Sequence, residues 1–542
     1  MNERTASVCV LVSAVFIAGC AVSGCQSIDK RAATASVSEE RLRDIEPLDL
    51  RPMAVPETGA PPAAPPAAAP AAPEVRLSLE ECRAAALENN LDLKVALVSP
   101  SIAAASVTEA EARFEALFFS DAFFGKTDDF SPLAGASRSE ATTADMGFRF
   151  PLRTGGTVTL DFPASRSDTP GAAPSYDTDA RFRLSQPLLR GGWLRANTHA
   201  IRIARYQSQA SEARAKLEVI RVIAETDRVY WRLYAARREL EVRRNEYDLA
   251  VAQLDRARRR VQAGAASEVE ITRAETGVAE RTEAIIIADN ALRQRERSLK
   301  RALNRPTLPM DAATVLVPAT EPNPVRYTLE APRLVKAALD NRMDMLEVEL
   351  QIAQDASTID FERNQALPSL ALEYTYNVNG AGSSAHDSLG RLNDRDFEDH
   401  TVGLSLEVPL GNAAAKSRLR QAILSRVQRL ATRDARASQI RQEVLDAIDQ
   451  IQTAWQRIVA SRQRTTLAER NLSAEIRQFD LGLRTSTDVL DAQTRLANAQ
   501  SAEIAALADY QVAQTDLAYS TGMLLGAARV RWQPSAGEKG KQ

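Results

Sequence analysis

The sequence predicts a mainly α-helical protein with transmembrane β-strands, built from a helix–strand–helix unit that occurs twice. Three observations lead to this fold class. Segments of the first half recur in the same order in the second half, pairs of segments alternate between apolar and polar residues, and a very long stretch in each half has heptad periodicity. Together they predict long coiled-coil helices joined to short membrane-spanning strands.

Three pairs of similar segments define the repeat. They are "LSLEECRAAALENNLDL" (77–93) with "YTLEAPRLVKAALDNRMDM" (327–345), "LSQPLLRGG" (184–192) with "LEVPLGN" (406–412), and "AGAASEVEIT" (263–272) with "LGLRTSTDVL" (481–490). The last pair has a constant offset of 218 residues and interrupts the helical pattern in both halves.

The repeat divides the chain into six predicted segments. They are a lipoprotein signal peptide (1–19), a Pro/Ala-rich tether (20–75), a first repeat (76–305), a linker (306–326), a second repeat (327–526) and a C-terminal tail (527–542).

The N-terminus has the pattern of an export signal. Arg4 precedes the apolar run "VCVLVSAVFIAGC", which is too short to span a membrane. Its end, "IAGC", resembles a bacterial lipobox with Cys20 as the acylated residue, and "VSGC" leaves Cys25 as a second candidate. An ordinary signal peptide is the alternative. The following segment, "PMAVPETGAPPAAPPAAAPAAP", is typical of an extended tether between a lipid anchor and a folded body.

Composition excludes several classes of function. Lys and Arg number 68 against 71 Asp and Glu, so no basic surface for nucleic acid is predicted. Beyond the N-terminus we expect no stretch of about 20 apolar residues, which a spanning helix needs. The chain has no nucleophile elbow, phosphate loop or Cys/His metal spacing, so we expect neither an enzyme nor a cofactor. The loop from His386 to His400 is better explained as a solvated acidic loop than as a metal site.

The strands have one apolar and one polar face. In "PSLALEYTYNV" and "TVGLSLEVP" the apolar residues occupy alternate positions: Leu370, Leu372, Tyr374, Tyr376 and Val378, then Val402, Leu404, Leu406 and Val408. Two such strands separated by a polar loop are typical of a transmembrane β-barrel hairpin, and half of a soluble sandwich is the alternative.

In the first repeat, 117–127 and 176–187 are the expected strands. A further hairpin at 146–162 either joins the barrel or projects from it. A sheet of four strands has two open edges, whose backbone N–H and C=O groups find no hydrogen-bond partners in lipid. The chain must therefore oligomerise.

The long helices reverse direction at a glycine. Residues 194–262 contain no Gly or Pro, which predicts a helix on the order of 100 Å long. Return helices are expected near 268–303 and 488–524. Gly264 and Gly482 therefore lie at the distal corners of two antiparallel helical hairpins.

The sequence resembles the TolC-like outer membrane factors over residues 77–526. The resemblance rests on the duplication, on "LALEYTYN" and "VGLSLEVPL", and on "RVQAGAASEVEITRAE" and "FDLGLRTSTDVLDAQTRLANAQ". It implies a homotrimer with a twelve-stranded β-barrel in outer membrane lipid and a long α-helical barrel in the periplasm. It also implies a periplasmic adaptor protein, which contacts the corners at Gly264 and Gly482, and an inner-membrane pump of the RND, ABC or MFS type.

The resemblance also implies a periplasmic gate at the corners. Asp488 and Asp491 match the acidic pair of the aperture, Arg484 matches the arginine that ties the closed tip, and Glu270 matches the acid it engages. Phe479 stands where the family has a Tyr, so one hydroxyl of that network is missing. Solvated charges near a helix start are the alternative explanation.

Two functions follow. The first is a passive exit duct of a tripartite efflux or type I secretion system, with an iris-like periplasmic gate. The second is a structural coiled-coil lipoprotein that bridges the outer membrane and the periplasm without a pore. Alternating strands such as "LALEYTYN" favour the duct, because a bridging lipoprotein needs no lipid-facing strand.

Overall fold

The structure is a computed structural model that describes residues 73–131, 135–169 and 173–531. The predictions for acylation of Cys20 or Cys25 and for residues 20–72 of the tether fall on residues outside this set. The predicted end of the tether at residue 75 is wrong, because residues 74 and 75 already belong to a strand, Glu74–Leu77. The last eleven residues of the predicted tail, 532–542, also lie outside it.

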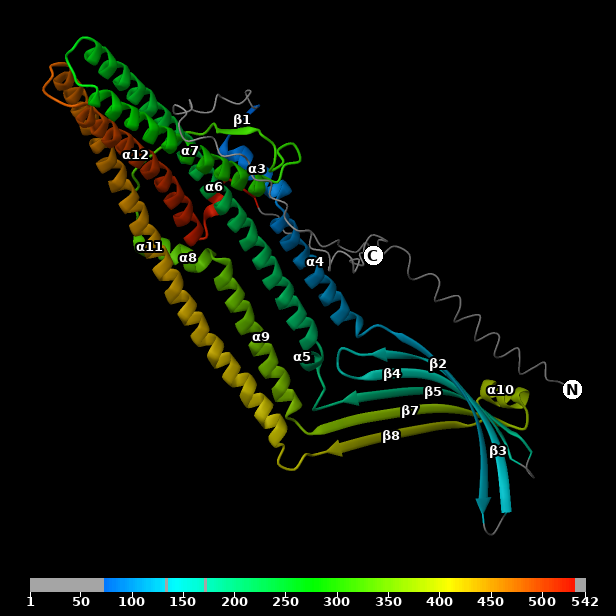
Figure 1. The fold of residues 1–542 in the computed structure, drawn as a ribbon. Coiled ribbons are helices and arrows are strands. Elements are labelled where there is room, and N and C mark those ends of the chain that lie inside the picture. Colours follow the sequence, from blue (N-terminus) through cyan, green and yellow to red (C-terminus); the bar gives the residue numbers. More distant parts are fainter. Residues whose placement is uncertain (1–72, 132–134, 170–172, 532–542) are drawn as a thin grey trace. The chain divides into compact units, whose positions relative to one another are not determined.

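Two antiparallel helical hairpins contain the longest elements of the described chain (Figure 1). In the first, α6 (His199–Gln262) is followed by α7 (Val269–Leu303), and in the second α11 (Ala413–Asp480) is followed by α12 (Ser486–Ser520). α6 has 64 residues and α11 has 68, so each is roughly 100 Å long. This length agrees with the length predicted from the sequence.

The chain enters each long helix through a left-handed turn. Gly191 and Trp193 have positive φ before α5 (Leu194–Asn197), as Gly411 and Asn412 do before α11. Backbones in this region turn sharply, which suits a change from strand to helix. The prediction of one unbroken helix from residue 194 is wrong, because α5 ends at Asn197 and α6 begins at His199.

The heptad positions form the contact seams of the hairpins. On α6, Leu233, Leu240 and Leu254 are buried, and Ala250 and Ala257 pack against α7. On α11 the residues at heptad spacing are all buried: Val444, Ile451, Ile458, Leu472 and Phe479. On α6, by contrast, Tyr247 and Val261 at the same spacing are half-buried. Small residues beside them allow close approach of the helices.

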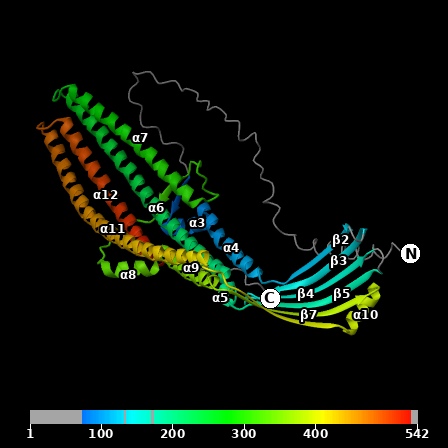
Figure 2. The same cartoon turned by 90° about the horizontal axis from the view of Figure 1, so that it is seen from below.

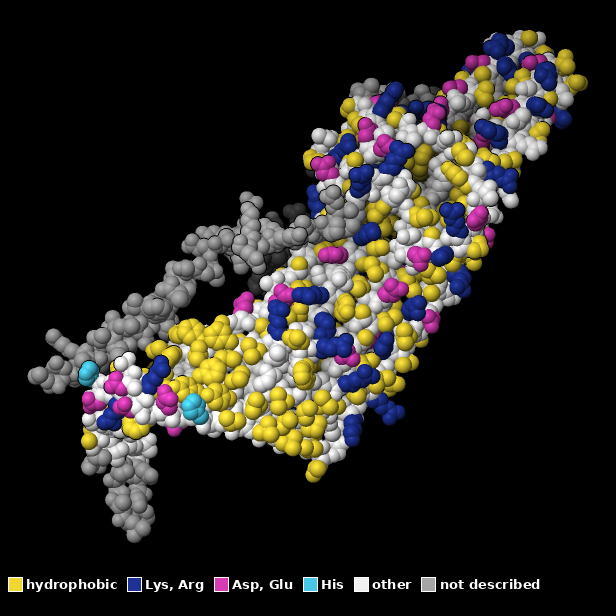
Figure 3. Space-filling model, turned by 180° about the vertical axis from the view of Figure 1, so that it is seen from behind, with side chains coloured by type: hydrophobic (Ala, Val, Ile, Leu, Met, Phe, Trp, Pro, Cys, Tyr) yellow, Lys and Arg dark blue, Asp and Glu magenta, His cyan; other side chains and the backbone are white. Residues whose placement is uncertain are grey.

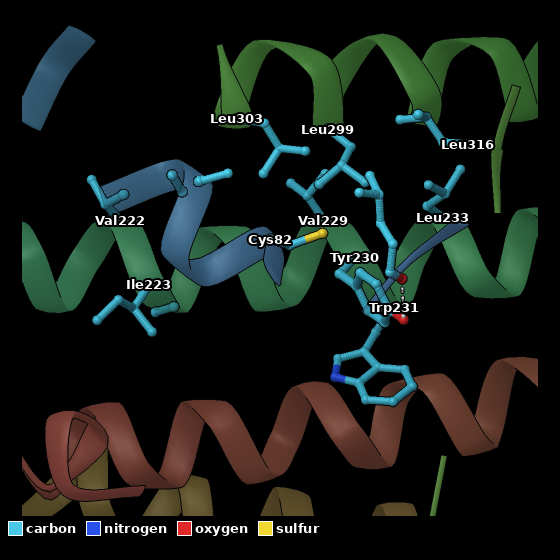
Figure 4. Close-up of a cluster of buried hydrophobic side chains, with 14 of the residues drawn as sticks. Cys82, Val222, Ile223, Val229, Tyr230, Trp231, Leu233, Leu299, Leu303 and Leu316 are labelled. Atoms are coloured by element: carbon cyan, nitrogen blue, oxygen red, sulfur yellow. Dashed lines mark hydrogen bonds between the residues drawn. The ribbon is translucent and has the colours of Figure 1, made fainter. Parts of the chain in front are cut away.

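A separate core joins the N-terminal segment to the middle of α6 (Figure 4). α3 (Leu79–Asn89) places the fully buried Cys82 against α6. The Tyr230 hydroxyl donates to the Leu77 carbonyl (3.2 Å) and accepts from the Thr320 amide (2.8 Å). Beside it, two short strands pair in parallel: β1 (Glu74–Leu77) and β6 (Val315–Pro318). The predicted linker therefore contains a strand.

One antiparallel sheet contains the six remaining strands, in the order β2-β3-β4-β5-β7-β8. Their bounds are β2 (Leu117–Ser131), β3 (Gly135–Pro151), β4 (Thr157–Asp168), β5 (Ser175–Pro187), β7 (Ser369–Gly382) and β8 (Glu398–Glu407). The open question about the hairpin at 146–162 is thereby answered, since β3 and β4 lie inside the sheet. The expectation of four strands is wrong.

The two faces of the sheet differ as predicted. The register places Phe118, Phe148, Leu160, Phe182 and Tyr376 side by side on five successive strands, so they share one face. In Figure 3 hydrophobic side chains gather over the strands, whereas charged side chains are spread over the helices. A sheet with one continuous apolar face is the expected wall of a membrane barrel.

Four further helices complete the fold. They are α8 (Ala331–Asn341), α9 (Met343–Gln365), α10 (Ala385–Asp394) and α13 (Leu524–Ala527). α10 lies in the stretch expected to be a polar loop and packs on β7 and β5 at the end of the sheet far from the long helices (Figure 2).

α4 (Leu91–Ala112) contradicts one expectation from composition. By length and composition it is apolar enough to cross a membrane, whereas no such stretch was expected beyond the N-terminus. In the structure α4 packs along α6, and Glu111 forms an ion pair with Arg205 (2.6 Å). Val95, Val98 and Ile102 on it are exposed.

Candidate functional site at the helical corners

The two corners have the same backbone hydrogen bonds. Gly264 has a φ of 70° and donates to the Val261 carbonyl, and the next amide bonds the carbonyl five residues back. Gly482 has a φ of 78° and donates to the Phe479 carbonyl, again followed by a bond to the carbonyl five residues back. Both are Schellman-type helix ends, in which glycine adopts the left-handed conformation without steric cost. The offset of 218 residues thus predicts equivalent turns correctly.

The corners lie side by side at the end of the helices far from the sheet (Figures 1 and 2). One side chain joins them directly. Arg260, in the last turn of α6, donates to the Phe479 carbonyl of α11 and stacks over the Phe479 ring at 4.7 Å. A guanidinium that combines a charged hydrogen bond with a cation–π contact is held in one orientation. A β-carbon at Gly482 would lie 3.4 Å from the same guanidinium.

A second contact joins the return helices. The Glu270 carboxylate accepts from the Ser486 amide at the first turn of α12 (2.9 Å) and forms an ion pair with Arg273 (2.9 Å). A carboxylate at a helix N-terminus compensates the free amides there. We call the contacts of Arg260 with Phe479 and of Glu270 with Ser486 the tip clasp.

Buried polar side chains continue this contact toward the sheet. Arg281 of α7 is buried and donates to the Leu490 carbonyl (3.2 Å) and to Thr494 on α12. It also forms ion pairs with Glu280 of its own helix (3.0 Å) and with Glu246 on α6 (3.5 Å). Gln493 of α12 donates to a carbonyl of α6 (3.3 Å). The first hairpin therefore contacts α12 through both the backbone and the side chains of α12.

The predicted gate residues lie at the corner, but two of them have other partners than expected. Arg484 pairs with Glu475 (3.3 Å) and donates to Gln478 (2.9 Å), both in its own hairpin. Within the described residues of one chain it forms no ion pair with Glu270. Asp488 accepts from the Thr485 amide (2.9 Å) as part of a capping box, while Asp491 is exposed one turn further on. The capping role agrees with the alternative of charges near a helix start.

Two carboxyl pKa values are displaced at the corner. Burial raises the pKa of Glu270, but the hydrogen bonds from Ser486 and the charge of Arg273 outweigh burial and hold it below its ordinary value. The backbone hydrogen bond from Thr485 lowers the pKa of Asp488. Both groups are therefore ionised at neutral pH.

A pH dependence of the clasp follows from Glu270. Since its pKa is lowered, its contribution is complete above the ordinary value of 4.5 and is lost as pH falls through the lowered value. We expect a constant open probability from pH 7 to 5 in planar bilayers and a rise below pH 4.5. The pKa of Asp488 is lowered as well, so Glu270→Gln is the comparison. It should be more open at neutral pH and less sensitive to acid, and an equal acid response in both proteins would contradict the assignment.

Sequence reasoning missed Arg260 and Ser486. The repeat offers no signal for Arg260, because its equivalent in the second half is Gln478. Ser486 acts through its backbone amide, which any residue type supplies. The one available hint was the run of three arginines that ends at Arg260, one turn before Gly264.

No metal-binding cluster of His, Cys, Asp or Glu occurs among the residues that the structure describes. In the loop that was weighed as a metal site, His400 instead stacks on the Tyr376 ring at 4.9 Å and lies 3.0 Å from the Tyr374 hydroxyl. This arrangement is aromatic packing on the sheet.

A sheet with one apolar face, joined to two helical hairpins roughly 100 Å long, defines the class of outer membrane channels with a helical duct. The model of the family described as "Outer membrane efflux protein" matches residues 135–305 and 334–523, and the chain belongs to this family. The protein is therefore an outer membrane efflux channel, a transport duct and not an enzyme.

Relatives and solved structures agree with this family. The outer membrane protein TolC of Vibrio cholerae is 24% identical over 396 residues, covering 72% of this chain and 86% of the relative. The outer membrane efflux protein BepC of Brucella suis is 23% identical over 383 residues, covering 70% and 80%. The outer-membrane channel OprN has a TM-score of 0.62 at 16% identity, covering 82% of this chain and 89% of that one. The Campylobacter jejuni CmeC channel has a TM-score of 0.60 at 17% identity, covering 82% and 86%. The likeness to the two solved structures is a likeness of fold.

Proposed function

We propose that the protein is the trimeric exit duct of a tripartite export system, closed at its periplasmic end by the tip clasp. The observation that carries this proposal is the pair of equivalent corners joined by Arg260 and Glu270. Substrate then passes from the periplasm to the exterior without chemistry in the duct. A periplasmic adaptor and an inner-membrane pump complete the system. The family match favours this duct over a bridging lipoprotein without a pore.

Oligomerisation is supported by the sheet and by α4. β2 and β8 are the edges of a six-stranded sheet, and the smallest closed membrane barrels have about eight strands. Lipid cannot satisfy the free backbone groups of these edges, so edges of neighbouring copies must pair. The exposed Val95, Val98 and Ile102 of α4 supply apolar surface that a neighbouring copy would cover. Three copies are the number typical of the family.

The gate is a contact between two hairpins that move relative to each other. Each hairpin has its own apolar seam, and Leu490 of α12 packs into the seam of the first hairpin, whereas contacts closer to the corners, such as that of Glu270 with Ser486, are polar. The polar groups at these contacts can bond water instead, at a small net cost in free energy. The two hairpins therefore separate at the corners more readily than the two helices of one hairpin separate along its apolar seam. One hairpin would swing away from the other, as in an iris.

The corners also present an apolar surface for the adaptor. Leu481 and Leu483 flank Gly482 and are 75% and 73% exposed. Val269 is exposed beside the other corner, near Gly264. Exposed apolar residues at the end of a long polar hairpin are typical of a protein contact site.

The acidic pair should determine ion preference at the aperture. Asp488 and Asp491 lie three residues apart, so they share a helix face, and a trimer would repeat that face around the axis. We expect Asp488→Ala combined with Asp491→Ala to weaken block by multivalent cations at least tenfold in planar bilayers. Asp509→Ala, an exposed acid far along α12, is the control and should leave block unchanged. Equal block in all three proteins would refute the assignment.

Lipidation is proposed at Cys20. Cys20→Ala should lose the mass of the lipid modification and leave a chain that is not anchored by acyl groups. Intact-mass analysis of purified outer membranes measures this, with Cys25→Ala as the matched control. If Cys25→Ala loses the mass instead, the anchor belongs to Cys25.

The duct itself is tested by reconstitution of the full chain in planar bilayers. The expected result is a channel of low conductance whose current rises when the clasp is broken. An insertion that adds no ionic current, with or without clasp variants, would favour the bridging lipoprotein.

A further inference from the structure

The hairpin of β3 and β4 is an internal part of the sheet. β3 pairs with β2 from Leu117↔Arg149 onward, and β4 pairs with β5 from Thr157↔Ser185 onward. β3 and β4 also pair with each other along the whole of β4. Both strands thus have hydrogen-bonded neighbours on both sides, which a projecting hairpin does not have.

Both strands have the same two faces as the rest of the sheet. Phe148 and Leu160 lie in register between Phe118 of β2 and Phe182 of β5, and all four are on the apolar face. On the opposite face Asp161 is fully buried and binds Arg183 (2.9 Å). A strand pair with lipid-compatible residues outside and ion pairs inside is a section of barrel wall.

The hairpin ends where the long helices begin. Its turn is anchored to the junction after β5, because Thr154 donates to the Gln186 side chain (2.8 Å) and the Gln186 amide donates back to the Thr154 carbonyl (3.2 Å). A β-carbon at Gly155 would lie 2.1 Å from the Gly191 carbonyl, so the turn fits closely. By contrast β2, β5, β7 and β8 each connect to a long helix. The hairpin therefore adds strands to the membrane part and no helix to the duct.

We propose that the β3–β4 hairpin widens the outer membrane barrel, so that the barrel admits larger solutes than a barrel with four strands per copy would. The inference rests on the trimeric channel proposed above. Three copies of this sheet make eighteen strands, whereas four strands per copy make twelve. Barrel diameter grows roughly linearly with strand number, so the diameter is about 1.5 times larger and the open cross-section about twice as large.

The β3–β4 hairpin does not widen the helical duct, because it adds no helix. The membrane part is then wider than the tip gate and is no barrier to a solute that the gate admits. Substrates of this channel should accordingly be limited in size by the corners and the helical duct.

The first experiment tests whether the β3–β4 hairpin forms part of the barrel wall. Single cysteines are placed on β3 at Asp145 and Phe148, which lie on opposite faces, and are exposed to a small charged maleimide on intact cells. Cys82, the one cysteine among the described residues, is buried, and Cys25 is replaced by serine in both variants. Asp145→Cys should be labelled from the lumen and Phe148→Cys should be protected by lipid. Rapid labelling at both positions would mean that the hairpin projects from the barrel, and would overturn the proposal.

The second experiment measures the size limit. Deleting residues 135–169 joins the end of β2 to the start of β5, which are antiparallel and have their apolar residues on the same face. Thr375→Cys, on the polar face of β7, reports access from outside. A maleimide on a polymer too wide for twelve strands should label the full chain at least tenfold faster than the deletion variant. A small maleimide should label both equally.

The outcomes separate the two proposals. If the small reagent fails to reach Thr375→Cys in the full chain, there is no aqueous lumen and the channel itself is refuted. If both reagents label the full chain and the deletion variant at equal rates, the channel stands and the widening is refuted. If the deletion variant does not assemble, the labelling pattern of Asp145→Cys and Phe148→Cys in the full chain decides.

Discussion

Arg260→Ala is expected to raise the open population of the periplasmic gate by about two orders of magnitude. The substitution removes a charged hydrogen bond to the Phe479 carbonyl and a cation–π contact with its ring. At a half-buried site these contribute together about 1 kcal/mol per copy. Three copies that open together then shift the equilibrium by about 3 kcal/mol. Single-channel recording in planar bilayers measures the change as open probability and mean conductance.

Three variants make this test specific. Arg259→Ala removes the same charge from the preceding, exposed position and should behave like the parent. Phe479→Leu keeps the backbone acceptor and removes the ring, so its effect should be intermediate. Arg484→Ser should also raise conductance, but less, because Arg484 pairs with Glu475 in its own hairpin. If Arg260→Ala and Arg259→Ala conduct alike, the clasp does not hold the gate.

Leu404→Arg is expected to prevent or strongly reduce assembly in the outer membrane. Leu404 lies on the apolar face of β8, opposite Leu372 of β7. An arginine that faces lipid near the middle of the bilayer costs roughly 2–4 kcal/mol per site, and a trimer contains three sites. The yield of heat-resistant oligomer in native membranes measures the effect, and Leu372→Arg should give the same loss.

The neighbouring polar face provides the control. Ser405→Arg and Thr375→Arg place the same side chain on the other face of the same strands, paired at Ala371↔Ser405 and Thr375↔Thr401. Both should assemble as the parent does, because a lumen-facing arginine remains hydrated. Equal assembly of all four variants would argue that no lipid contacts this sheet.

Features that depend on local periodicity were predicted well. The alternation in "LALEYTYN" identifies the apolar face that the register shows, and the heptads from Val444 to Phe479 identify the buried seam. Glycine at 264 and 482 identifies both corners, because a left-handed helix end needs a residue without a β-carbon. Each of these signals lies within a short window of the chain, where the backbone conformation is decided by the residues themselves.

Features that depend on which segments meet were predicted less well. The hairpin around Met146 and Phe162 has clear strand patterns, but its membership of the sheet rests on pairing with β2 and β5. The apolar character of α4 was underestimated, since its alanines and serines dilute the signal. Arg484 and Glu270 were matched through the resemblance, yet in this chain Arg484 contacts Gln478 and Glu475, and Glu270 contacts Ser486 and Arg273.

The sequence by itself therefore determined the long helices, the two corners, the apolar face and the class of protein. Only the tertiary structure decided that six strands share one sheet and that Arg260 and Glu270 form the clasp. The physical reason is the nature of the contacts. Backbone carbonyls and amides, such as those of Phe479 and Ser486, are present at every position and leave no mark in the residue pattern. Which of them meets a given side chain depends on how two hairpins, more than 200 residues apart in sequence, pack against each other.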